Sequence, residues 1–250
     1  MSAEQVAFVA LAGFLAGAIN AIVGSGSLIT FPTLLAIGLP PVTANVTNTV
    51  GIVFGSVSAV VGYRRELRPQ IRRALKLSIP TVLGAGLGAM LLLKLPQRVF
   101  GFVVPVLVAL AVLLVVFQPH LSRRLAAGGT PPRWGRHVVP IGVFLTAIYG
   151  GYFGAAQGVI LMGLLTVMLR DDIQELNAVK NVVAGVANLV AALIFLAVAH
   201  IAWQAAGVIA VSSILGGQAG SLVGRRLNPL MMRLVIAAAG IAALVKLLLH

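Results

Sequence analysis

The sequence predicts an all-α polytopic membrane protein. Of its 250 residues, 60% are hydrophobic and only 9% are charged, whereas a soluble domain is about 25% charged. So few charged side chains cannot cover a water-facing surface, which excludes an ordinary soluble enzyme and a disordered segment. The chain has no cysteine, which excludes a disulfide scaffold. Two further observations, a series of apolar runs and two matched glycine clusters, predict the details of the fold.

Eight apolar runs follow one another along the chain, most of them near the ~20 residues that span a bilayer as a helix. They are Val6–Leu39, Val42–Tyr63, Ile71–Leu93, Val99–Phe117, His137–Leu169, Leu176–Ala199, Ile201–Val223 and Leu230–Leu249. The first and the fifth are too long for one simple crossing, and each contains a glycine cluster. Because glycine disfavours helix continuation, both runs are predicted to be broken or re-entrant helices.

Basic residues give the chain a net charge of +13 and gather in three of the breaks between runs. They are Arg64, Arg65, Arg68, Arg72, Arg73 and Lys76 in the first break, Arg123, Arg124, Arg133 and Arg136 in the central linker, and Arg225, Arg226 and Arg233 in the last. The break near His200 has none. The positive-inside rule therefore places the three basic loops in the cytoplasm and the His200 turn outside. In so apolar a chain, the expected partner of this charge is the lipid bilayer and not nucleic acid.

The two halves of the chain align with each other at an offset of 132 residues without a gap. Related pairs include Gly26 and Gly158, Asn45 and Asn177, Gly84 and Gly216, and Gly88 and Gly220. The breaks between apolar runs share the same offset. The sequence therefore predicts a first transmembrane repeat over residues 1–118, a basic linker over residues 119–137 and a second repeat over residues 138–250.

Sidedness predicts that the two repeats are inverted relative to each other. The basic loop at residues 64–76 corresponds to the turn near His200, and the sparsely charged turn at residues 94–98 corresponds to the basic break at residues 225–233. Inversion requires an odd number of crossings per half. Each first segment should therefore enter as a half-length helix, break at its glycines and return, which leaves three transmembrane helices in each half. Eight plain crossings is the competing prediction. Inverted repeats with interrupted helices are typical of secondary transporters that work by alternating access.

In such transporters the substrate binds near the middle of the membrane, where the broken helices lie. A glycine-rich break before a helix offers free amides and the positive end of the helix dipole, which suit an anion. The residues predicted to bind substrate at the breaks are Gly24, Ser25, Gly26 and Ser27 in the first half and Gly154, Gln157 and Gly158 in the second. The alternative is that glycine only lets helices pack closely, which is the interpretation preferred for Gly84, Gly86 and Gly88.

Polar residues also recur on one face of the helix that follows each break. They are Asn45, Asn48, Thr49 and Ser56 in the first half and Asn177, Lys180, Asn181 and Asn188 in the second. Since an unpaired asparagine is costly in lipid, both stripes should face protein or a water-filled cavity. All of them except Ser56 are predicted to bind substrate. For Ser56 and Asn188, a structural bond between helices is an equal alternative.

Lys180 lies one turn into an apolar helix, and no acidic residue shares its face. One interpretation is a cation that faces the anion cavity and selects for negative charge. The other is that its side chain reaches the membrane surface, where Asp172 or Glu175 would pair with it.

Other chemistry is not predicted. The histidines, His120, His137, His200 and His250, lie at the ends of apolar runs, and no P-loop or pair of intramembrane carboxylates is present. We expect no enzyme activity, no catalytic residue, no metal and no cofactor. Coupling to protons or to another ion, such as sodium held by backbone carbonyls, stays open. An anion channel is one alternative to a transporter, and a serine hydrolase that uses Ser25 or Ser27 with His200 is another.

Two stretches of the sequence carry a resemblance to a known family. The first is AGAINAIVGSGSLITFP at residues 16–32 with GLPPVTANVTNT at residues 38–49, and the second is YGGYFG at residues 149–154 with NAVKN at residues 177–181 and Asn188. Together with Gly216, Gly217 and Gly220, they resemble the TauE/SafE sulfite-exporter family, also called the toluene-sulfonate uptake permease family.

This resemblance implies a permease of the bacterial inner membrane that moves sulfite, sulfonates such as sulfoacetate, or related small organic anions, usually with ion or proton coupling. Ser25 and Ser27 interrupt a glycine run that is often unbroken in the family. Residues 155–157 stand where a further glycine or proline is common. These departures add side chains to the predicted pocket, so the anion stays open, as do the direction of transport, the coupling ion and the oligomeric state, a homodimer included.

Overall fold

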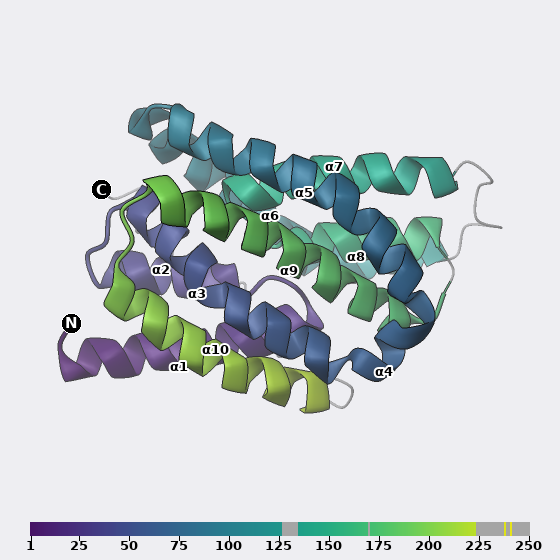
Figure 1. The fold of residues 1–250 in the computed structure, drawn as a ribbon, viewed down its shortest axis with the longest axis horizontal. Coiled ribbons are helices and arrows are strands. Elements are labelled where there is room, and N and C mark those ends of the chain that lie inside the picture. The colour runs from purple at the N-terminus through teal and green to yellow at the C-terminus, as the bar shows by residue number, and fades with distance from the viewer. Residues whose placement is uncertain (127–134, 170, 224–237, 239–240, 242–250) are drawn as a thin grey trace.

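The computed structural model of the protein describes residues 1–126, 135–169 and 171–223, together with residues 238 and 241 (Figure 1). All regular elements in these ranges are helices, which confirms the all-α class. They are α1 (Ala3–Ile22), α2 (Ser27–Ala36), α3 (Pro41–Gly62), α4 (Arg64–Leu67), the short 3₁₀ helix η1 (Arg68–Gln70), α5 (Ile71–Lys94), α6 (Gln97–Ala126), α7 (Gly135–Tyr152), α8 (Gln157–Met168), α9 (Ile173–Val198) and α10 (Trp203–Val223). The predicted run Leu230–Leu249 and the basic break at residues 225–233 lie almost entirely outside the described residues.

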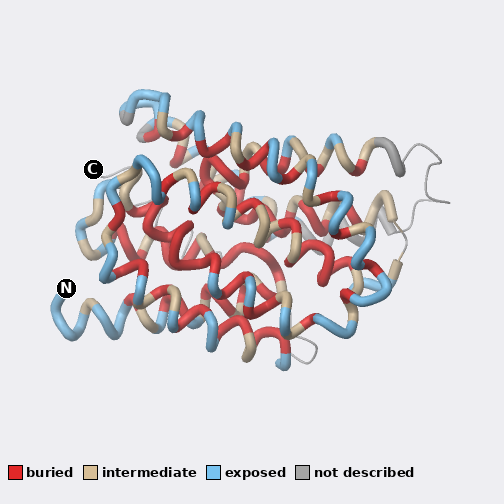
Figure 2. Tube along the Cα trace, in the orientation of Figure 1, coloured by how far each residue is buried: buried red, intermediate tan, exposed pale blue. Residues whose placement is uncertain are grey.

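Within the described residues, six helical stretches are long and apolar enough to cross a membrane. They are Ala3–Ile22, Pro41–Gly62, Arg64–Lys94, Arg98–Phe117, Ile173–Val198 and Trp203–Val223. Their outer faces are apolar, as in the exposed row of Leu75, Ile79 and Leu83 on α5. Figure 2 shows the buried trace gathered in the middle of the bundle and the exposed trace along the outer helices. The protein is therefore a multi-pass membrane protein, as predicted.

Both long apolar runs break at their glycine clusters, as predicted. The first breaks between the end of α1 and the start of α2, and the fifth between α7 and α8. Gly24 and Gly154 adopt φ angles of 84° and 75°, which only glycine reaches without strain. Ala156, the residue before α8, is the one described non-glycine residue with positive φ, at 59°. A left-handed residue cannot continue a right-handed helix, so each break is fixed locally.

The lengths of the broken helices differ from the prediction. The 10 residues of α2 and the 12 of α8 make half-length helices, as expected. However, α1 has 20 residues, which is about 30 Å of helix and enough to cross the bilayer alone. The prediction that α1 is half-length is therefore wrong. At the predicted linker, residues 119–137, α6 continues to Ala126 and α7 begins at Gly135.

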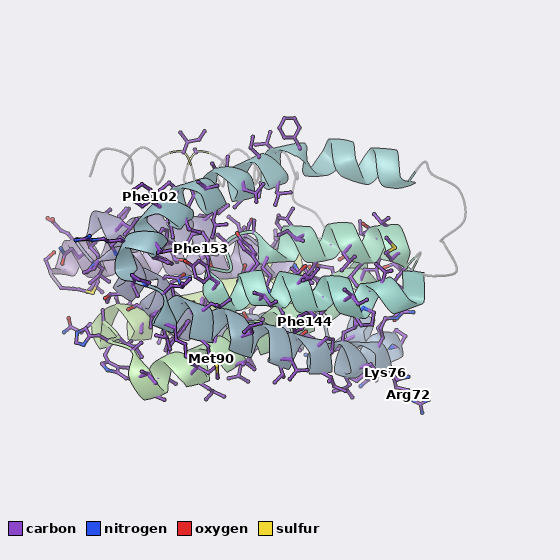
Figure 3. All side chains as sticks on the ribbon, turned by 90° about the horizontal axis from the view of Figure 1, so that it is seen from above. Arg72, Lys76, Met90, Phe102, Phe144 and Phe153 are labelled. Atoms are coloured by element: carbon purple, nitrogen blue, oxygen red, sulfur yellow. The ribbon has the colours of Figure 1, made fainter. Side chains whose placement is uncertain are left out.

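Helices related by the 132-residue offset run in opposite directions in Figure 1. There, α1 and α3 begin at the left end of the bundle, whereas α7 and α9 begin at the right end. The packing partners also correspond, because α1 packs along α10 and α7 packs along α5. Figure 3 shows the second pair, with α5 marked by Lys76 and Met90 and α7 marked by Phe144. Inversion itself stays a prediction, since no bilayer fixes the two sides.

Glycines bring both of these helix pairs into backbone contact. A Cβ atom on Gly216 of α10 would lie 1.9 Å from the carbonyl oxygen of Phe14 in α1. A Cβ atom on Gly88 of α5 would lie 2.0 Å from the carbonyl oxygen of Ile148 in α7. Gly84 makes a similar approach to Phe144, at 2.4 Å. The close-packing interpretation of Gly84 and Gly88 therefore agrees with their surroundings, through small residues at a membrane helix interface.

Gly86 does not fit that interpretation. The nearest atoms to a Cβ placed on it are 4.0 Å away, at Ile194 and Val190. Gly86 faces a neighbouring helix without a close backbone approach, so the packing interpretation is wrong at this position.

Gly88→Ala should lower the free energy of unfolding by about 1–3 kcal/mol, because the added methyl group has no space beside α7. Gly86→Ala is the matched control on the same helix, two residues away. It should be neutral or stabilise the protein by up to about 1 kcal/mol, since alanine favours the helix and meets no close atom. Thermal unfolding in detergent measures both. Equal effects of the two substitutions would contradict the packing described here.

Candidate functional site

The glycine breaks of the two halves touch each other in the middle of the bundle. The amide of Gly158 donates a hydrogen bond of 2.9 Å to the carbonyl oxygen of Gly24. A Cβ atom on Gly24 would lie 2.4 Å from the Cα atom of Gly158. Residues that the sequence places in separate halves, at Gly24–Ser27 and Gly154–Gly158, therefore form one region. Neither break could carry a side chain at this contact.

Three donors from one face of α9 meet the carbonyl end of α1. The side-chain amides of Asn177 and Asn181 each donate to the carbonyl oxygen of Ala21 at 3.1 Å. Lys180 Nζ donates to the carbonyl oxygens of Asn20 at 3.0 Å and Ala21 at 3.4 Å. The last carbonyls of a helix have no partner within it and carry its partial negative charge. These three side chains of α9, in the second half, therefore cap the end of α1, in the first half.

Of the polar residues of α3 that align with those of α9, only one, Asn45, makes the related contact and caps the end of α7 in the other half. Asn45 Nδ2 donates to the carbonyl oxygen of Tyr152 at the end of α7, at 3.0 Å. Asn48, which aligns with Lys180, instead donates to Ser27 Oγ at 3.0 Å and accepts a hydrogen bond from Thr30. The end of α7 is thus capped by an amide, and no cationic side chain of the described residues bonds to it.

The remaining stripe residues have structural partners. Thr49 donates to the carbonyl oxygen of Asn45 one turn earlier in the same helix, at 2.9 Å. Asn188 Nδ2 donates to Ser56 Oγ at 3.4 Å. Because Ser56 and Asn188 are themselves related by the 132-residue offset, α3 and α9 meet at equivalent positions. For this pair, the bond between helices that the sequence left as an alternative is present.

Lys180 is fully enclosed. Its exposed fraction is 0%, so the alternative in which its side chain reaches the membrane surface is wrong. Neither acidic candidate pairs with it, because Asp172 caps the start of α9 and Glu175 accepts a hydrogen bond from Gln70. No described carboxylate forms an ion pair with Lys180; Arg73 and Asp171 form the ion pair at the end of the bundle. Burying a charge costs several kcal/mol unless it is compensated, so this site favours an anion.

The backbone amides of the breaks are largely used within the protein. The amides of Gly24, Gly26 and Leu28 donate to Ile19, to the side chain of Asn20 and to Ser25. The amides of Gly154 and Gln157 donate to Tyr149 and Gly154. The prediction of a cradle of free amides is therefore wrong at these positions. The glycines shape the site more than they supply donors to it.

Side-chain atoms supply the free hydrogen-bonding capacity instead. Five buried polar atoms at the breaks and stripes have no partner among the described residues, namely Ser25 Oγ, Asn45 Oδ1, Tyr152 Oη, Gln157 Nε2 and Asn177 Oδ1. Buried polar groups are normally paired, so each of these atoms marks a position where a ligand or water would complete the bonding. Gln157 Nε2 is a donor and Ser25 Oγ can donate, which suits an anion.

The sequence did not single out two residues that take part. Asn20 supplies a carbonyl to Lys180 and a side-chain oxygen to the amide of Gly26, at 3.0 Å. Tyr152 supplies the carbonyl that Asn45 caps. The available signal was their position, since both precede a glycine break at the end of a long apolar run and are related by the 132-residue offset.

Two cavities open at opposite ends of the bundle, away from this region. One of about 530 Å³ is lined by Arg72, Arg73 and Lys76 at the start of α5, and Figure 3 shows Arg72 and Lys76 at that end. The other, of about 310 Å³, is lined by His200 and the start of α3. Neither is lined by a predicted site residue. The described residues also contain no group of three or more His, Asp or Glu side chains that could hold a metal.

Gly24→Ala should destabilise the protein by more than about 2 kcal/mol, because it adds left-handed backbone strain and a clash with Gly158. The control is Gly163→Ala in α8, where nothing lies within 4 Å of an added Cβ atom and alanine should be neutral or stabilising by up to about 1 kcal/mol. Unfolding curves in detergent compare the two. If Gly24→Ala is as stable as Gly163→Ala, the contact between the breaks is incorrect.

Comparison with known proteins agrees with this architecture. Residues 9–247 match the family described as sulfite exporter TauE/SafE. The chain is 28% identical to a probable membrane transporter protein of Haemophilus influenzae, over 87% of this chain and 84% of that one. It is 27% identical to the probable membrane transporter protein ORF9 of Sinorhizobium sp, over 97% and 92% of the two chains. It is also 27% identical to the probable membrane transporter protein YfcA of Escherichia coli K12, over 83% and 76%.

No solved structure matches the chain. The family match covers both halves, including the two glycine breaks and the two polar stripes. The chain therefore belongs to the TauE/SafE sulfite-exporter family of membrane proteins.

Proposed function

We propose that the protein is a secondary transporter that moves small sulfur-containing or organic anions, such as sulfite, sulfonates or sulfoacetate, across the bacterial inner membrane. The observation that carries this proposal is the position of Lys180. It is buried, has no described carboxylate partner, and bonds to the end of α1 just before the first glycine break, which in turn contacts the break of the other half. An anion would balance its charge and could accept hydrogen bonds from the unpaired donors Gln157 Nε2 and Ser25 Oγ. The relatives, which are named as probable membrane transporters, support the same reading.

The proposed mechanism is alternating access between two inverted repeats, residues 1–118 and 138–250. Opposite helix directions and corresponding helix pairs support inversion. Neither of the two cavities at the ends of the bundle is lined by the buried Lys180, which favours a carrier over an open channel. In this arrangement the central linker and the basic loop at residues 64–76 are cytoplasmic, and the His200 turn is external.

The proposal assigns no catalytic residue and requires no cofactor. For the serine hydrolase alternative, Ser25 is buried at the break, whereas His200 is exposed and lines the cavity at the end of the bundle. The substrate-binding set stays the one predicted from the sequence. It comprises Gly24–Ser27, Gly154, Gln157, Gly158 and the residues of the α3 and α9 stripes other than Ser56. Asn20 and Tyr152 are added to it because their carbonyls hold those stripes.

Uptake into proteoliposomes tests the proposal. Sulfite, sulfate, sulfoacetate, an aryl sulfonate and a carboxylate are offered with and without a pH gradient. We expect at least one sulfur oxyanion to be taken up with saturation and counterflow. Lys180→Ala should lower that uptake by about tenfold or more, since it removes a buried charged hydrogen-bond donor.

Lys94→Ala, at the exposed end of α5, is the control for this test and should leave uptake unchanged. Flux without saturation or counterflow would favour the channel. Unchanged uptake of every accepted anion by Lys180→Ala would contradict the assignment of the site.

Single cysteines test the proposed orientation, because the natural chain has none. Pro69→Cys lies in the basic loop and His200→Cys at the opposite end, and both positions are exposed. A membrane-impermeant thiol reagent should label Cys at 200 in right-side-out vesicles and Cys at 69 only in inverted ones. Labelling of both from the same side would contradict the inverted arrangement.

A further inference from the structure

The carbonyl end of α1 has the chemistry of a cation site. In transporters built from interrupted helices, the carbonyl ends of those helices coordinate the coupling sodium ion or proton. Here the carbonyl oxygens of Asn20 and Ala21 lie at such an end, that of Ala21 also accepts from Asn177 and Asn181, and the partial negative charge of the helix adds to them. A small monovalent cation is the ligand that these groups would ordinarily take.

In this protein the position is filled by a side chain. Lys180 Nζ lies 3.0 Å from the carbonyl oxygen of Asn20 and 3.4 Å from that of Ala21. It is fully buried and reaches across from the opposite half of the chain. An ammonium group has three donors and no acceptor, so two carbonyls leave one donor for a further ligand.

The related position in the other half shows that this is not a general feature of the repeat. Asn48 aligns with Lys180 but turns to Ser27 and Thr30, and an amide from Asn45 caps the end of α7. The ends of α1 and α7 are equivalent, and both lie within the described residues. Of these two ends, only that of α1 therefore binds a cationic side chain. A structural need to cap a broken helix would be met by asparagine at both ends.

We infer that the Lys180 amine takes the place of a soluble coupling cation at the carbonyl end of α1. Anion transport by this chain then needs no sodium, and removing the amine leaves an empty site for a small monovalent cation. The statement on transport rests on the proposed function, whereas the cation site does not. Shortening the Lys180 side chain removes the ammonium group but keeps the carbonyl groups of Asn20 and Ala21. A small cation from solution should then bind where the ammonium group was.

Thermal unfolding of purified Lys180→Ala tests the site without any transport assay. The protein is measured in sodium, methylammonium and choline chloride at equal ionic strength. Sodium or methylammonium should raise the unfolding temperature of Lys180→Ala relative to choline, which is too large for the site, because a ligand that binds only the folded state stabilises it. Wild type should show no such difference.

Two variants serve as controls. Lys180→Met fills the same space with an apolar chain and should not respond to the cation. Asn48→Ala removes the related side chain in the other half, where no carbonyl end is vacated, and should not respond either. If Lys180→Ala does not fold, Lys180→Asn, which carries the residue of the related position, is measured in the same way.

Uptake assays then test the consequence for transport. Replacing sodium by choline should change wild-type uptake by less than about twofold. Lys180→Ala should recover its uptake several-fold in sodium or methylammonium, as expected when a buried donor is restored. The inference is overturned if wild-type uptake requires sodium, or if no small cation stabilises Lys180→Ala or, where that variant does not fold, Lys180→Asn. If wild type moves no anion at all, the proposed function fails, and the unfolding temperatures still decide the inference.

Discussion

The bond between the carbonyl end of α1 and the polar face of α9 is the constraint on which the rest of the structure depends. The last carbonyl groups of α1 have no partner within the helix, and here they are buried against the other half of the chain. Asn177, Lys180 and Asn181 satisfy those of Asn20 and Ala21. Without such donors, these buried carbonyl groups at the glycine break would be left unpaired, which is costly. The break and the stripe therefore require each other.

The same constraint ties the two halves together. Asn177 of the second half caps a helix of the first, Asn45 of the first caps a helix of the second, and Gly158 bonds directly to Gly24. Each half supplies the hydrogen-bond donors that the broken helix of the other half lacks. Because the site lies where the two halves meet, any movement of one half relative to the other changes the site. Alternating access would use such a movement.

Much of this architecture follows from the sequence. Glycine clusters inside overlong apolar runs predicted the two breaks, and helical spacing predicted that Asn177, Lys180 and Asn181 share a face. Residue spacing predicts which side chains share a helix face, but not what that face contacts. It could therefore not show that this face of α9 contacts α1 and not an open cavity. It also could not show that the amides of Gly24 and Gly26 bond within the protein, since that depends on backbone angles at the break.

The central claim is that an anion lies against Lys180 between the glycine breaks. Electron cryo-microscopy of the protein with selenite, an electron-dense analogue of sulfite, tests it most directly. The account predicts density within hydrogen-bond distance, about 3 Å, of Lys180 Nζ and the unpaired side chains of Ser25 or Gln157. Density found only in the basic cavity at Arg72 and Lys76, with the region around Lys180 empty, would contradict it.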